Sequence, residues 1–126
     1  MSICLYAGGK AVTIAAAAFT LSWTHSVEKV IWEEDWRLTG AGLRIVEARV
    51  KGTGAGMEIP EGAVLKDGAW AYAPKLPPQR KIVLARSGAT GGGWKICGEG
   101  ECRTVGADAG EPAEIGACGQ RRAPAQ

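Results

Sequence analysis

The segment WTHSVEKVIWEEDW, residues 23–36, gathers the side chains of this sequence that are best suited to chemistry. It contains His25, the only histidine, and three of the five tryptophans. His25 and Glu34 are of the types that form proton-transfer pairs, and tryptophans can wall a pocket around such a pair. Whether these side chains meet depends on the strands that carry them.

Two alternating segments position these residues. In FTLSWTHSV, 19–27, apolar residues and His25 alternate with serine and threonine. In VIWEEDWRL, 30–38, Trp32 and Glu34 share one face with the other apolar residues. Such alternation is typical of a half-buried strand, so both segments are predicted to be strands.

A hairpin that turns at residues 28–29 would pair the two segments. In that register His25 faces Trp32 and Trp23 faces Glu34, all on the apolar side of the sheet. His25 and Glu34 then become diagonal neighbours within reach of each other. A carboxylate among tryptophans must be hydrogen-bonded or paired, because an isolated buried charge is strongly unfavourable.

Three interpretations of this cluster compete. It is a buried structural His–Glu pair, a binding pocket formed by Trp23, Trp32, His25 and Glu34, or a catalytic pair. The catalytic interpretation has no nucleophile to support it. Ser26 follows His25 in the strand, so its side chain points to the opposite face and His25 cannot easily activate it. A metal site lacks a second histidine at ligand spacing. We therefore predict a binding site without catalytic residues, metal or cofactor; a metal-binding sandwich and a small hydrolase are the alternatives.

Two glycine-rich segments, 52–56 and 87–93, resemble phosphate loops only superficially, because no helical segment follows either one. Tight turns with positive φ explain these glycines. Alternatively, backbone N–H groups of one loop form an anion-binding nest helped by an arginine just before it. The candidate residues of this second site are Arg49, Gly54, Gly56, Arg86 and Ser87.

The bulk properties indicate one globular domain. The chain has 126 residues, 46% of them hydrophobic, and a net charge of +2. The charges form no basic stripe interleaved with aromatic residues, so a nucleic-acid partner is not expected. The most apolar run, 11–19, is too short to span a bilayer and lacks the layout of a secretory signal. No transmembrane segment is expected.

The pattern along the chain is almost entirely β. Apolar runs around Gly8-Gly9 predict a first hairpin over 3–14, and no segment keeps a helical period. Further strands are predicted at 42–51, 67–74 and 80–86, a hairpin at 93–105, and an irregular segment at 52–63. Eight or nine short strands predict one antiparallel β-sandwich or flattened barrel over residues 1–118, followed by a disordered tail at 119–126.

The four cysteines allow three disulfide pairings. Cys97 and Cys102 flank a predicted hairpin tip and would face each other within disulfide range. Cys4 and Cys118 lie near the two ends of the chain and would staple them. Four reduced thiols are the alternative in a cytosolic protein.

Three segments taken in order resemble a known family, the domain of unknown function 1850. They are HSVEK at 25–29, GAGM at 54–57 and RSGA at 86–89, and the resemblance extends from about Ile3 to Cys118. Members of that family are typically encoded beside the fused membrane subunits of TAXI-type TRAP transporters, which take up organic acids with an extracytoplasmic binding protein.

The resemblance implies a partner rather than a reaction. It implies a non-enzymatic accessory module that contacts the permease or its substrate-binding protein, with a small organic acid as a further ligand. Many members carry an N-terminal anchor or signal, which implies a place outside the cytoplasm; this chain instead begins directly in its first predicted strand. No catalytic residue is implied by the resemblance.

Overall fold

The computed structural model describes residues 2–24, 30–51, 62–86, 93–106 and 110–119. These residues form two antiparallel sheets, as predicted, and the sheets pack as a sandwich without closing into a barrel. The four-stranded sheet has the order β2 (Lys10–Ile14), β1 (Ile3–Ala7), β11 (Gly110–Ala117), β8 (Lys81–Arg86). The seven-stranded sheet has the order β10 (Glu101–Val105), β9 (Trp94–Gly98), β3 (Ala18–Thr24), β4 (Ile31–Thr39), β5 (Gly42–Lys51), β7 (Ala69–Tyr72), β6 (Val64–Lys66).

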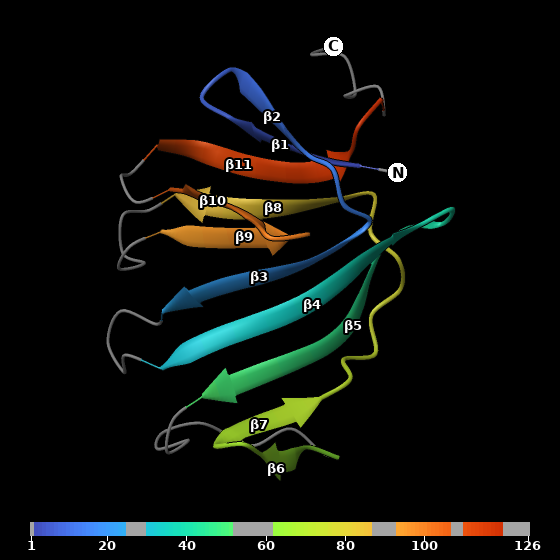
Figure 1. The fold of residues 1–126 in the computed structure, drawn as a ribbon, viewed down its shortest axis with the longest axis vertical. Helices are drawn as coiled ribbons and strands as arrows, with labels where there is room; N and C mark the ends of the chain where they lie inside the picture. Colours follow the sequence, from blue (N-terminus) through green and yellow to red (C-terminus); the bar gives the residue numbers. More distant parts are fainter. Residues whose placement is uncertain (1, 25–29, 52–61, 87–92, 107–109, 120–126) are drawn as a thin grey trace.

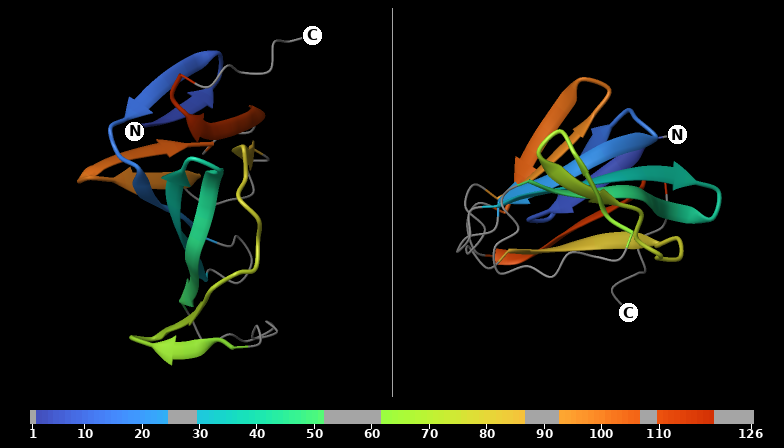
Figure 2. Two further views of the ribbon diagram at one scale, coloured as in Figure 1. Left: turned by 90° about the vertical axis from the view of Figure 1, so that its right-hand side faces the viewer. Right: turned by 90° about the horizontal axis from the view of Figure 1, so that it is seen from below.

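The core lies between the two sheets (Figures 1 and 2). Because successive strand residues point to opposite faces, one apolar residue in two enters it. The fully buried large side chains are Ile3, Ile14, Leu21, Leu43, Leu84, Ile96, Ile115 and Val50. Figure 1 shows that β4, β5, β7 and β6 continue beyond the smaller sheet, so the two layers overlap only in part.

Two strands exceed the eight or nine that the sequence predicts. The strand β11 contains Pro112 and two glycines, which weaken a strand pattern, and its ladder with β8 is irregular between Gly110 and Ala113. The strand β6 has only three residues, all exposed, and it joins β7 through a turn at Asp67-Gly68. Neither strand shows enough alternation along its length to be predicted as a strand.

A bulge in β5 sets which side chains face outward. Asp35 lies opposite Glu47 and Trp36 lies opposite Ile45, so Val46 is an extra residue in the ladder. Its side chain is 48% exposed. The extra residue lets Ile45 on one side of the bulge and Ala48 on the other both reach the core.

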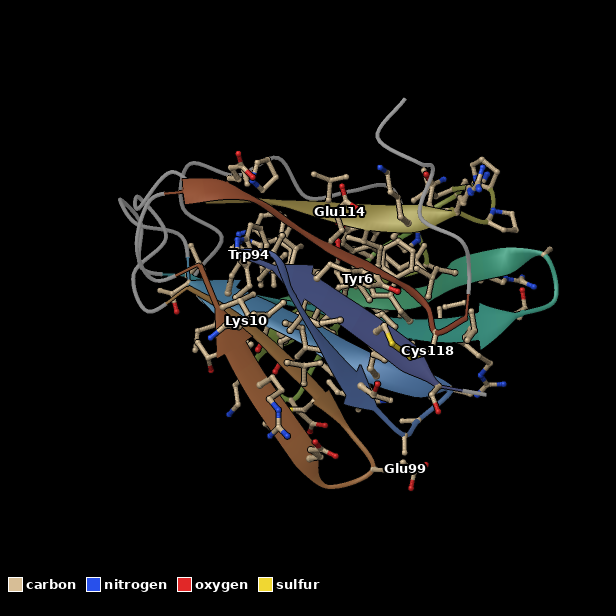
Figure 3. The ribbon with its side chains drawn as sticks, turned by 90° about the horizontal axis from the view of Figure 1, so that it is seen from above. Tyr6, Lys10, Trp94, Glu99, Glu114 and Cys118 are labelled. Carbon is tan, nitrogen blue, oxygen red and sulfur yellow. A yellow bond between two sulfur atoms is a disulfide. The ribbon has the colours of Figure 1, made fainter. Side chains whose placement is uncertain are left out.

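Disulfides join Cys4 to Cys118 and Cys97 to Cys102, with S–S distances of 2.10 Å and 2.09 Å. The first connects β1 to the residue that follows β11 (Figure 3). The second joins directly opposed residues of the β9–β10 hairpin. Both pairs are those expected from the sequence.

The described part of the chain contains no helix with the length and apolarity needed to cross a bilayer. At the C-terminal end, Gly119 lies in a turn with φ of 81°. The rest of the predicted tail, 120–126, lies outside the described residues.

Candidate functional site

The strands β3 and β4 bring Trp23 and Trp32 together on the inner face. The two residues are directly opposite, and their rings stack with centroids 6.1 Å apart and an interplanar angle of 7°. The predicted register, with Trp23 opposite Glu34, was wrong by two residues; Leu21 takes that place instead. A slip of two preserves the face of every side chain, so the grouping of tryptophans with Glu34 survives the correction. His25 lies outside the described residues.

Trp94 on β9 joins this group. Its ring centroid lies 4.8 Å from that of Trp23, with the planes tilted by 50°. Its indole N–H donates a hydrogen bond of 2.9 Å to the carbonyl oxygen of Ala85 on β8. Trp94 therefore ties the seven-stranded sheet to the four-stranded one (Figure 3). The prediction missed it, although its alternation with buried Ile96 places it on the inner face.

Glu34 lies beside Trp32 on the same face, half-buried, and has a partner on its own strand. The indole N–H of Trp36 donates a hydrogen bond of 3.0 Å to its Oε1. Burial raises the pKa of the Glu34 carboxyl above its usual value, and the hydrogen bond from Trp36 opposes this rise. The carboxyl is thus held by an indole donor and is easier to protonate than an exposed glutamate.

Tyr72 extends the group on the far side of Glu34. Glu34 lies opposite Ala48, and Ala48 lies opposite Tyr72, so all three share the inner face of adjacent strands. Burial raises the pKa of the Tyr72 hydroxyl, and the negative charge of Glu34 raises it further. We call Trp23, Trp32, Trp94, Glu34 and Tyr72 the indole–carboxylate cluster. It combines flat aromatic surface with a carboxyl group and a hydroxyl group whose pKa values are both raised, which suits it to hold and hydrogen-bond a small ligand.

The raised pKa of Glu34 has a measurable effect on stability. The folded state keeps the Glu34 proton to a higher pH than the unfolded chain, so stability falls as pH rises from the unfolded pKa, about 4.3, through the folded value. In the Glu34→Gln variant this loss of stability with rising pH is abolished, because glutamine does not ionise. The glutamine side-chain oxygen can still accept the hydrogen bond from Trp36. We expect the stability of the variant relative to the wild type to increase between about pH 4 and about pH 7 in urea unfolding.

The control for this prediction is Glu99→Gln, which removes a carboxylate from the exposed tip of the β9–β10 hairpin (Figure 3). It should not reproduce the pH-dependent gain. If the stability of Glu34→Gln relative to the wild type decreased toward neutral pH, the pKa of Glu34 could not be raised in the folded state.

Arg49 lies near the C-terminal end of β5, on the outer face. Its guanidinium donates to Asp35 at 2.6 Å and 3.0 Å, to Glu47 at 2.7 Å and to Glu33 at 3.2 Å. Asp35 also accepts a hydrogen bond of 2.8 Å from Thr20. The hydrogen bonds from Arg49 are the main reason that the pKa of Asp35 is lowered. In the described structure Arg49 is therefore the centre of an ion-pair network.

The remaining predicted residues are not brought together in the described structure. Arg86 ends β8 in the four-stranded sheet, opposite Gly110, whereas Arg49 belongs to the seven-stranded sheet. Gly54, Gly56 and Ser87 lie outside the described residues. The anion-binding nest therefore stays a prediction.

Comparison with known proteins identifies a family. A model of the family described as domain of unknown function (DUF1850) matches residues 19–105. This span holds nearly all of the seven-stranded sheet and β8, and it leaves β1, β2 and β11 outside. No curated protein and no solved structure matches the chain. Since the family model covers more than half of the sequence, the chain belongs to the DUF1850 family.

Proposed function

We propose that this protein is a non-enzymatic accessory module of a TAXI-type TRAP transporter for organic acids, and that it contacts the permease or its substrate-binding protein through β6. The transporter part of the proposal rests on the resemblance carried by the HSVEK, GAGM and RSGA segments. The contact surface rests on one structural observation, the exposed apolar edge of the seven-stranded sheet.

That edge is built by the short strand β6. Val64 and Leu65 are adjacent and 63% and 58% exposed, so apolar surface faces solvent on both sides of the strand. Among the described residues, β6 pairs with β7 alone and ends the sheet (Figure 1). An exposed edge strand can pair with a strand of another protein, whose side chains then contact the apolar residues of the edge.

Affinity capture of the tagged chain from detergent-solubilised membranes of its host tests this proposal. We expect the wild type to capture the permease or the binding protein. The double variant Val64→Lys, Leu65→Lys should lose this capture, because lysine on an edge strand opposes pairing. Both side chains are exposed, so the fold should remain intact.

The matched control is Val83→Lys on β8, where the valine is 54% exposed in the other sheet. It should capture like the wild type. Failure of the wild type to bring down either transporter component would contradict the transporter role. Equal capture by the wild type and the β6 variant would instead remove β6 as the contact surface.

A second candidate function is small-ligand binding by the indole–carboxylate cluster. The observation that favours it is the stacked pair Trp23 and Trp32, both only partly buried, beside a carboxyl with a raised pKa. A ligand in contact with these rings should change tryptophan emission in titrations with organic acids and divalent metal ions. Unchanged emission throughout, or binding that Glu34→Ala leaves unaltered, would contradict it.

A further inference from the structure

A hollow of about 340 Å³ opens on the outer face of the seven-stranded sheet, and its lining also includes Trp23 of the indole–carboxylate cluster. Its volume falls near the lower end of the range for small-molecule sites, which begins at about 300 Å³. The residues used below all line it: Ser22, Thr24, Ile31, Lys51, Lys95 and Thr104.

Strand register brings these side chains together. Lys95 on β9 lies directly opposite Ser22 on one side and Thr104 on the other. In the next row, Ile31 lies opposite both Thr24 and Lys51. Directly opposed residues have their side chains on the same face of the sheet. The hollow is therefore formed by regular positions of five adjacent strands, β10, β9, β3, β4 and β5.

The charges in the hollow are unequal. Lys51 Nζ lies 3.3 Å from Glu33 Oε1, and the same oxygen accepts a hydrogen bond of 3.2 Å from Arg49. Lys95 is exposed, and no acidic side chain in the described part of the chain pairs with it. Glu33 is the one described carboxylate in the lining, against Lys51 and Lys95. Lys51 is therefore already paired, and Lys95 is the lysine of the lining that is left to bind a single negative group.

The other lining groups further restrict the class of ligand that would fit the hollow. The hydroxyl groups of Ser22, Thr24 and Thr104 can donate hydrogen bonds to anionic oxygens. Ile31 is 41% exposed and offers apolar contact to a short hydrocarbon chain. Glu33 opposes a second negative charge on the ligand. We propose that this hollow binds a small monocarboxylate, with its carboxylate beside Lys95 and its hydrocarbon part over Ile31. The site does not depend on the transporter role proposed above.

Amide chemical shifts of the full chain, followed by NMR during titration with sodium butyrate, test the proposal. We expect saturable changes at Ser22, Thr24, Lys95 and Thr104. Lys95→Gln should weaken butyrate binding by about tenfold, because it replaces a charge-assisted hydrogen bond with a neutral one. Lys95→Arg keeps the charge and should retain most of the affinity.

Two controls separate this site from a general charge effect. Lys75→Gln removes an exposed lysine that does not line the hollow, and it should bind butyrate like the wild type. Butyramide has the same shape without the charge and should give no saturable change. The proposal would be overturned if butyramide bound as tightly as butyrate, or if inorganic phosphate bound more tightly than butyrate. It would also be overturned if Lys75→Gln weakened butyrate binding as much as Lys95→Gln does. Shifts confined to Trp32 and Tyr72 would place the ligand on the inner face and would overturn it as well.

Discussion

Replacing both Cys4 and Cys118 with alanine should lower the free energy of unfolding by about 5 kcal/mol. The two cysteines are 114 residues apart in sequence, so their disulfide closes almost the whole chain into one loop. In the chain-entropy model, a cross-link over about 100 residues restricts the unfolded state by roughly 4.7 kcal/mol. Because small domains are stabilised by only about 5–15 kcal/mol, this variant should be partly or largely unfolded at 37 °C.

The second disulfide provides the internal control for this prediction. Cys97 and Cys102 are only five positions apart in sequence, and the same model gives a loss of only about 2 kcal/mol for replacing that pair. Urea unfolding of the two double-alanine variants, both compared with the oxidised wild type, measures the difference. An equal loss in both variants would show that loop length does not govern the stabilisation.

Gly42→Ala should destabilise the protein by about 3 kcal/mol. Gly42 has φ of 124°, which side-chain-bearing residues rarely adopt, and a Cβ there would lie 2.7 Å from the carbonyl oxygen of Gln79. Backbone strain of this kind contributes roughly 1–3 kcal/mol, and the contact adds to it. That oxygen cannot move freely, because it accepts a hydrogen bond of 2.7 Å from Leu43 N, and Gln79 N donates one of 2.7 Å to Leu43 O.

Gly40→Ala, two residues earlier in the same turn, is the matched control. Gly40 has no positive φ, and an added Cβ would meet no atom within 4 Å. The alanine there should be neutral or stabilising by roughly 0.4–1 kcal/mol, since it restricts only the unfolded chain. Thermal unfolding of both variants measures the contrast. Similar melting temperatures would mean that the backbone at Gln79 shifts to accommodate the added Cβ at little energetic cost.

The sequence predicts the fold class because most strands carry a clear alternation. The first hairpin turns at Gly8-Gly9, where both glycines have positive φ, and β5 has the predicted bounds of 42–51. By contrast, β11 shows alternation only at Ala113 and Ile115, and the three-residue β6 is too short to show any. Such strands form because neighbouring strands complete their hydrogen bonds, which no local pattern reveals.

Only part of the candidate site is predicted from the sequence, and its contacts are not. Alternation alone places Trp23, Trp32 and Glu34 on one face, and this holds whatever the register. The register itself depends on where the turn falls, so Trp23 lies opposite Trp32 instead of Glu34. Trp94 and Tyr72 come from strands distant in sequence, and only the sheet order brings them to Trp23 and Glu34. The outer hollow was missed for the same reason.

The order of strands in the small sheet also constrains how the protein is made. During synthesis β1 and β2 leave the ribosome long before β11, which is the sheet neighbour of β1. Ile3 and Leu5 on β1 therefore lack part of their final cover until Ala117 has emerged. The Cys4–Cys118 bond can form only after that point. A molecule that carries this bond has therefore had β11 synthesised and brought beside β1.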